Sequence, residues 1–125
     1  MSRRYLLAII SDATRIMECG TSFGLATIYI ALALNQSTPG KQGNDCRIFT
    51  VEKDGSKVAK AKEIWTEAWK DVESWIDARE GDLLEVLEEE TLPPVIDLVF
   101  LDGNLSPYAV CVDSVANSTF KNGLH

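Results

Sequence analysis

The chain has 125 residues and a formal net charge of −7, a length typical of one domain. Hydrophobic residues make up 46% and charged residues 25%, which is the balance of a folded globular protein rather than a disordered chain. The negative charge argues against non-specific nucleic-acid binding, which needs a basic face. The apolar part of residues 1–10 is too short to span a bilayer, so we expect neither nucleic acid nor membrane as a partner.

Cysteine usage bears on the compartment. The three cysteines, Cys19, Cys46 and Cys111, are odd in number and lack the spacing of metal ligands. This pattern predicts free thiols in a reducing, cytoplasmic setting.

Apolar runs alternate with helix-like segments along the chain. We expect strands at residues 15–19, 47–51, 75–80 and 95–101. Helices are expected at residues 23–34, 56–74 and 83–90, with further helical segments at 5–10 and 107–117 and a surface loop at 35–45. In the segment 56–74, apolar residues recur every three or four positions, which is helix periodicity. Trp65 and Trp69 belong to this stripe, so we interpret them as core residues.

The alternation of strands and helices predicts the fold class. Strand–helix–strand units imply right-handed crossovers and a parallel sheet with helices on both faces. We therefore expect an α/β, Rossmann-like fold of about four βα units. Ligands of such sheets bind at the carboxyl ends of the strands, near the point where strand order reverses.

The turn at residues 18–24 is the first candidate for a site. It joins an expected strand to an expected helix, and such a turn points backbone N–H groups at whatever lies above it. Gly20 permits a tight bend, and Gly24 permits close packing of the helix start. Glu18 can accept hydrogen bonds from a cationic or hydroxylated ligand. An ordinary structural joint remains the alternative.

Each expected strand is followed by an acid at or near its end, namely Glu18, Glu52, Asp82 and Asp102. In a parallel sheet these positions lie along one rim, where like charges repel. The acid after the second strand suits a ribose diol, and the acid after the third can accept from an exocyclic amine. Alternatively, Asp82 caps a helix and Asp102 simply terminates a buried strand.

These motifs together resemble class I S-adenosylmethionine-dependent methyltransferases, in the small-molecule O-methyltransferase group similar to catechol O-methyltransferase. Residues 18–24 resemble the E-x-G-x-x-x-G motif of that group. The second motif is matched by residues 51–54, the G-D-x-x-x-x-L segment by 80–87, and the strand beside the methyl donor by 96–103. All four occur in order.

The resemblance implies roles for individual residues. The methionine part of S-adenosylmethionine would lie against Glu18, Gly20, Thr21, Ser22, Gly24 and Ala26. Glu52 would bind the ribose, and Asp82 and Leu83 the adenine. Asp102 would face the sulfonium, or ligate Mg²⁺ as in the metal-dependent members. At Ala26 the hydroxyl of a frequent serine is missing.

The implied activity is methyl transfer to an oxygen of a small molecule, by residues 1–125 as a single, C-terminally truncated domain. No catalytic residue is assigned, because Leu105 occupies the place of the lysine that serves as base in many relatives. A non-catalytic remnant that binds the cofactor or a partner chain is the alternative. We also expect the unpaired edge of a shortened sheet to favour a homo-oligomer. A nicotinamide-dependent dehydrogenase is disfavoured because the turn lacks G-x-G-x-x-G spacing.

Overall fold

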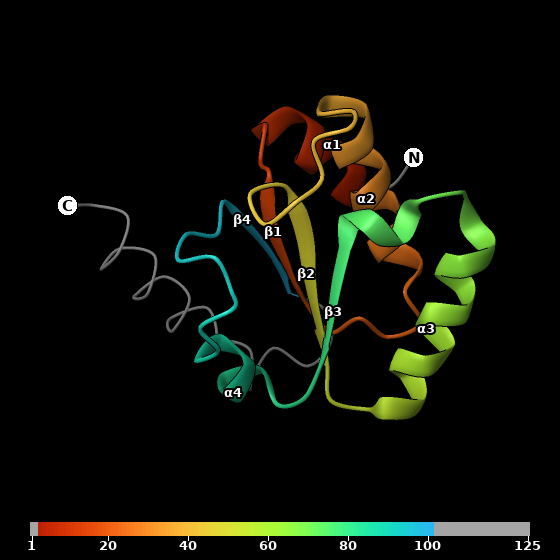
Figure 1. Ribbon diagram of the computed structural model, residues 1–125, viewed down its shortest axis with the longest axis vertical. Helices are drawn as coiled ribbons and strands as arrows, with labels where there is room; N and C mark the ends of the chain where they lie inside the picture. The colour runs from red at the N-terminus through yellow and green to blue at the C-terminus, as the bar shows by residue number, and fades with distance from the viewer. Residues whose placement is uncertain (1–2, 102–125) are drawn as a thin grey trace.

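The computed structural model describes residues 3–101 as an α/β fold (Figure 1). In chain order its elements are α1 (Arg3–Ser11), β1 (Arg15–Cys19), α2 (Leu25–Ser37), β2 (Arg47–Glu52), α3 (Gly55–Ala68), the 3₁₀ helix η1 (Val72–Trp75), β3 (Ile76–Glu80), α4 (Leu83–Leu87) and β4 (Leu98–Leu101). Asp102 and the helix expected at 107–117 lie outside the described residues.

The four strands form one parallel sheet in the order β3-β2-β1-β4. The chain steps outward from β1 through β2 to β3 and then returns to the other side of β1. Strand order therefore reverses between β1 and β4, and the predicted Rossmann-like fold is confirmed. Among the described strands, β4 pairs with β1 alone. The association of two copies through an unpaired edge stays a prediction.

Helices cover both faces of the sheet, with α1, α2 and α3 on one face and α4 on the other (Figure 1). Successive side chains of a strand point to opposite faces. Ile16 consequently belongs to the core under α1–α3, whereas Met17 and Cys19 belong to a smaller cluster with Leu83 of α4. The larger core thus lies between the sheet and the helices α1, α2 and α3.

The helix expected at residues 56–74 is shorter than predicted. It ends at Ala68, Trp69 is extended, and Asp71 has a left-handed φ of 71°. Beyond this break, Val72 and Trp75 of the following 3₁₀ turn are both buried in the core. Trp75 therefore precedes β3 instead of starting it.

The fourth strand is also shorter than expected and begins at Leu98 rather than at residue 95. The residue before it, Asp97, donates its backbone N–H to the carbonyl of Arg15 at 2.8 Å. Its carboxylate Oδ2 accepts from the backbone N–H of Thr14 and of Arg15, at 3.2 and 2.9 Å. Asp97 thus ties the start of β4 to the start of β1.

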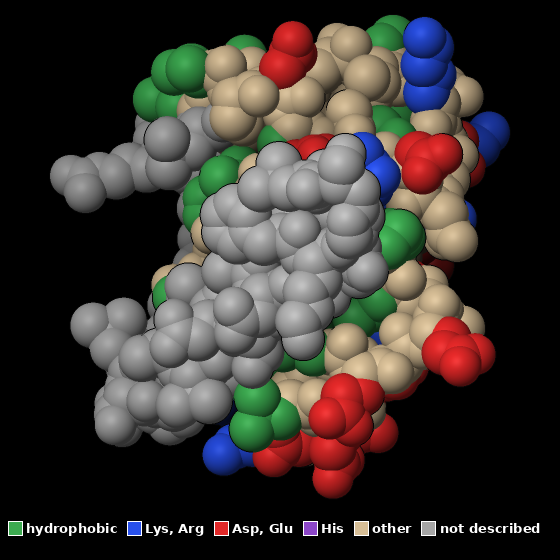
Figure 2. Space-filling view, turned by 90° about the vertical axis from the view of Figure 1, so that its left-hand side faces the viewer, with side chains coloured by type: hydrophobic (Ala, Val, Ile, Leu, Met, Phe, Trp, Pro, Cys, Tyr) green, Lys and Arg blue, Asp and Glu red, His purple; other side chains and the backbone are tan. Residues whose placement is uncertain are grey.

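Residues 88–90 are exposed acids that follow α4 rather than ending it. Acidic side chains gather at the lower end of the molecule in Figure 2. Glu89, one of the acids at residues 88–90, pairs with Arg79 at 3.1 Å. Within residues 3–101, no helix combines the length and apolar character needed to cross a membrane.

Candidate functional site

The turn between β1 and α2 has a backbone that few residues adopt. Gly20, Ser22 and Gly24 have positive φ angles of 99°, 52° and 83°. The N–H groups of Gly20 and Thr21 both donate to the carbonyl of Val51, at 2.9 and 3.2 Å. These bonds hold the turn against the carboxyl end of β2, so residues from two strands meet at this edge.

The last residue of the turn, Gly24, has no room for a side chain. A Cβ there would lie 2.6 Å from Nε1 of Trp65 and 2.8 Å from Cβ of Ala61. The indole N–H of Trp65 donates to the Gly24 carbonyl at 2.9 Å. Sequence patterning identified Trp65 as a core residue, which its burial confirms, but gave no sign of this contact.

Three backbone N–H groups at the start of α2 are available to a ligand. Within residues 3–101, the N–H groups of Phe23, Leu25 and Ala26 have no hydrogen-bond partner. The first N–H groups of a helix lack intrahelical acceptors, and the helix dipole adds partial positive charge there. α2 has 13 residues, so this end suits an anionic group such as a carboxylate.

Glu52 ends β2 beside this turn. Its Oε1 accepts from the N–H of Ser22 at 2.9 Å, and its Oε2 accepts from the N–H of Asp54 at 3.2 Å. Each carboxylate oxygen can accept more than one hydrogen bond. The half-buried carboxylate is therefore oriented by the backbone while it retains capacity for two hydroxyl groups.

Glu18 lies deeper than the strand-end pattern suggested. It precedes the last residue of β1, is 0% exposed, and accepts at Oε1 from the hydroxyls of Thr27 and Thr50, at 2.5 and 2.6 Å. Glu18 is thus buried, whereas Glu52 is half-buried and Asp82 is exposed. Direct contact between Glu18 and a ligand stays a prediction.

Asp82 is the N-cap of α4. Its exposed side chain accepts from the backbone N–H of Leu84 at 2.9 Å, as the capping alternative predicted. Leu83 is half-buried against the cluster of Met17 and Cys19. The roles of Asp82 and Leu83 toward adenine stay predictions.

No metal site is seen in the part of the chain that the structure covers. Residues 3–101 contain no group of three or more histidine, cysteine or acidic side chains that could hold an ion. The predicted magnesium ligand, Asp102, lies outside this range, so its role stays a prediction.

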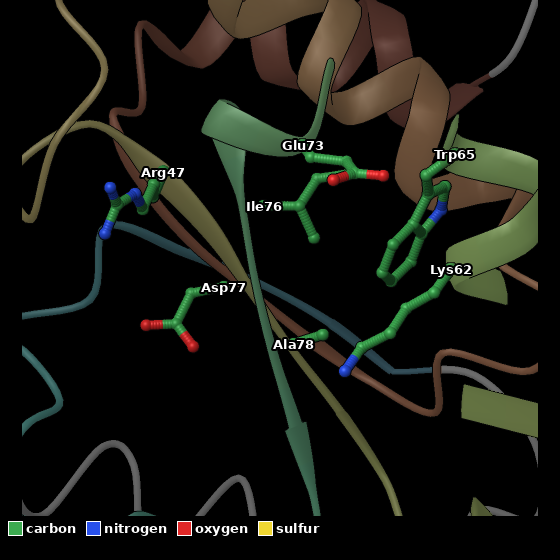
Figure 3. Close-up of a pocket in the computed structure, with 7 residues that line it drawn as sticks. All are labelled: Arg47, Lys62, Trp65, Glu73, Ile76, Asp77 and Ala78. Atoms are coloured by element: carbon green, nitrogen blue, oxygen red, sulfur yellow. The ribbon is translucent and has the colours of Figure 1, made fainter. Parts of the chain in front are cut away.

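A separate pocket of about 490 Å³ lies beside the edge strand β3 (Figure 3). Its lining residues are Arg47, Lys62, Trp65, Glu73, Ile76, Asp77 and Ala78. The two acids already have partners, because Asp77 pairs with Arg79 at 3.0 Å and Glu73 accepts from Thr66 at 2.6 Å. None of the residues proposed from the sequence lines this pocket, so it is distinct from the turn at residues 20–24.

The fold and this turn are those of cofactor-binding α/β proteins. Comparison with known families identifies the family within this class. The family model described as "Methyltransferase domain" matches residues 17–118. The chain belongs to this methyltransferase family, and the class I S-adenosylmethionine-dependent methyltransferase resemblance is confirmed. No curated protein sequence matches it.

Solved structures of O-methyltransferases share the fold. A putative O-methyltransferase from Klebsiella pneumoniae has 28% identity and a TM-score of 0.76, over 93% of this chain and 48% of that one. The O-methyltransferase TomG from Streptomyces achromogenes, in complex with SAM, has 25% identity and a TM-score of 0.74, over 93% and 48%. An O-methyltransferase from Bacillus cereus in complex with SAH shares the fold at 22% identity and a TM-score of 0.75, over 93% and 49%. The chain spans about half the length of these proteins.

Proposed function

We propose that the chain binds S-adenosylmethionine at the carboxyl edge of β1 and β2 and serves methyl transfer to an oxygen of a small molecule. The observation that carries this proposal is that the turn at residues 20–24 brings together the start of α2, where three N–H groups have no partner within residues 3–101, and the oriented carboxylate of Glu52. This pairing of an anion-binding helix start with a diol-binding acid suits a ligand that has a carboxylate and a ribose.

The residues present fit the two ends of such a cofactor. The N–H groups at the start of α2 would hold the methionine carboxylate, next to Gly20, Thr21, Ser22, Gly24 and Ala26. Glu52 would accept from the two ribose hydroxyls, and Asp82 and Leu83 lie beyond the next strand, where the adenine would be. Half-buried Leu83 offers apolar surface to a flat ring.

The chemistry supplied by the bound cofactor is a methyl group on a sulfonium, open to displacement by an oxygen. The contribution of the chain is to fix the cofactor so that the acceptor approaches in line, and such positioning lowers the barrier by removing orientational freedom. Similarity to O-methyltransferases supports oxygen as the acceptor atom. We place Asp102, which directly follows β4, near the sulfonium, or at a Mg²⁺ ion that would lower the pKa of the acceptor hydroxyl.

Calorimetric titration of the 125-residue chain with S-adenosylmethionine, with NAD as the control ligand, tests the proposal. We expect binding of the first and not the second. Glu52→Ala should weaken binding by about tenfold or more, because it removes charge-assisted hydrogen bonds. A matched control is Glu63→Ala, whose exposed side chain lies in α3, away from the turn in sequence, and pairs with Lys60. A folded chain with no affinity for S-adenosylmethionine would refute the proposal.

A non-catalytic cofactor-binding chain is the second candidate, favoured by Leu105 at the place of the base in many relatives. The two candidates predict the same binding but different turnover. Transfer of a radiolabelled methyl group to a panel of catechols and other small hydroxylated acceptors distinguishes them. Binding without transfer to any acceptor would favour the second candidate.

A further inference from the structure

A chain of buried hydroxyl groups runs beneath the turn at residues 20–24. The hydroxyls of Thr27 and Thr50 both donate to Oε1 of Glu18, and the hydroxyls of Thr50 and Thr21 are 2.6 Å apart. A hydroxyl carries one proton. Because the proton of Thr50 is directed to Glu18, Thr21 must donate to Thr50.

This hydrogen-bond chain links the three elements that meet at the turn. Glu18 belongs to β1 and is the register partner of Thr50 in β2, while Thr27 lies in α2. Thr21, within the turn itself, is the outer end of the chain. Glu18, Thr27 and Thr50 are 0% exposed, and Thr21 is 4% exposed. These groups are therefore out of reach of water, and their hydrogen bonds to one another support a single arrangement of the three elements.

The hydrogen-bond chain through Thr21, Thr50 and Glu18 anchors one end of the turn, and a second anchor holds the other end. The carbonyl of Gly24 accepts from the indole of Trp65, whose side chain is buried and comes from α3. Between the two anchors lie Ser22, with its left-handed φ, and Phe23, whose N–H has no partner in the described part of the chain. The backbone that faces the proposed cofactor is thus held at both ends by hydrogen bonds to buried side chains of β2 and α3.

We infer that Thr27, Thr50 and Trp65 are positioning residues, which set the affinity for S-adenosylmethionine by holding the turn in its binding conformation through Glu18 and Gly24. This inference rests on the proposed function. If the turn becomes ordered only when the ligand binds, the free-energy cost of that ordering reduces the net affinity. Loss of either anchor therefore weakens binding without removal of any group that touches the ligand.

The test compares four variants of the full chain. Thr50→Val removes the hydroxyl at nearly constant shape, and Thr50→Ser restores it. Trp65→Phe keeps an aromatic ring and removes the indole N–H. Val72→Ala is the matched control, because Val72 is 1% exposed in η1 and belongs to neither anchor. The measurements are the Kd for S-adenosylmethionine, the Tm, and amide hydrogen exchange at residues 20–26 without ligand.

We expect Thr50→Val and Trp65→Phe each to raise Kd by about tenfold and to speed exchange at residues 20–26. Thr50→Ser should stay close to the wild type. Val72→Ala should lower the Tm with an unchanged Kd. The inference is overturned if Thr50→Val and Trp65→Phe lower the Tm alone, with Kd and exchange at the turn as in the control.

Failure of the proposed function gives a different result. If the wild type binds no S-adenosylmethionine, the proposed function fails. Hydrogen exchange then tests separately whether the two anchors hold the turn in place. Faster exchange at residues 20–26 in Thr50→Val then supports them, and unchanged exchange overturns them. Should Thr50→Val fail to fold, Trp65→Phe carries the same comparison.

Discussion

Gly24 gives the sharpest test of how this turn is built. The change Gly24→Ala places a Cβ at a residue with φ of 83°, 2.6 Å from Nε1 of Trp65 and 2.8 Å from Cβ of Ala61. The left-handed backbone costs about 1–2 kcal/mol for a residue with a side chain. Overpacking costs about 1–3 kcal/mol more. The sum, about 2–5 kcal/mol, is a large part of the free energy of unfolding of a domain, which is about 5–15 kcal/mol.

Gly40 supplies the control, because it has a φ of 75° and nothing within 4 Å of a built Cβ. Gly40→Ala should therefore show the backbone cost alone. Equilibrium unfolding in urea measures both variants, and with a slope of about 1.5 kcal/mol per molar the midpoint of Gly24→Ala should fall by about 1–3 M. Equal losses in the two variants would refute the argument, since the difference between them measures the contact with α3.

Two further predictions concern ion pairs. Asp97→Asn should cost about 1–2 kcal/mol at neutral pH, because its partly exposed carboxylate accepts from the backbone N–H of Arg15. Burial raises the pKa of Asp97, but N–H donors and the Arg15 guanidinium outweigh it and hold the pKa below its usual value. The stability is thus present above the unfolded pKa and lost below about pH 4, so urea midpoints of wild type and variant should converge there; a constant gap would contradict this. Arg79→Lys should cost about 1–3 kcal/mol by calorimetric melting, because the fork to Asp77 needs a planar guanidinium. Lys60→Ala removes an exposed ion pair and should change the stability little. Equal losses of stability in Arg79→Lys and Lys60→Ala would argue against a contribution from the paired hydrogen bonds between Arg79 and Asp77.

The local parts of this fold could be predicted from the sequence. The strand at residues 15–19 has the predicted bounds, and Asp82 caps α4 by accepting from the backbone N–H of Leu84 at 2.9 Å. Both are encoded within a few residues, by an apolar β-forming run and by a capping side chain next to a turn. The glycines of the turn at residues 20–24 were found for the same reason, since a left-handed backbone favours glycine wherever the turn lies.

Element ends that depend on packing could not be predicted in this way. The periodic stripe in residues 56–74 continues past Ala68, where α3 ends. Beyond the break, Val72 and Trp75 are buried in the core with residues of α2, and these contacts depend on residues that are distant in the sequence. Helix periodicity records which positions are apolar, but not where a chain turns to bury them.

The sequence by itself determined the parallel α/β fold, the glycine turn and the acid at the end of β2, since each follows from a short pattern. Tertiary structure alone decided what holds the turn. Trp65 reaches Gly24 across 41 positions, and Thr50 reaches Glu18 across 32. Only the sheet register and the packing of α3 bring these atoms together. Glu18, which the sequence places next to the end of a strand, is therefore a buried hydrogen-bond acceptor in the fold, because its neighbours in space, not along the chain, set its surroundings.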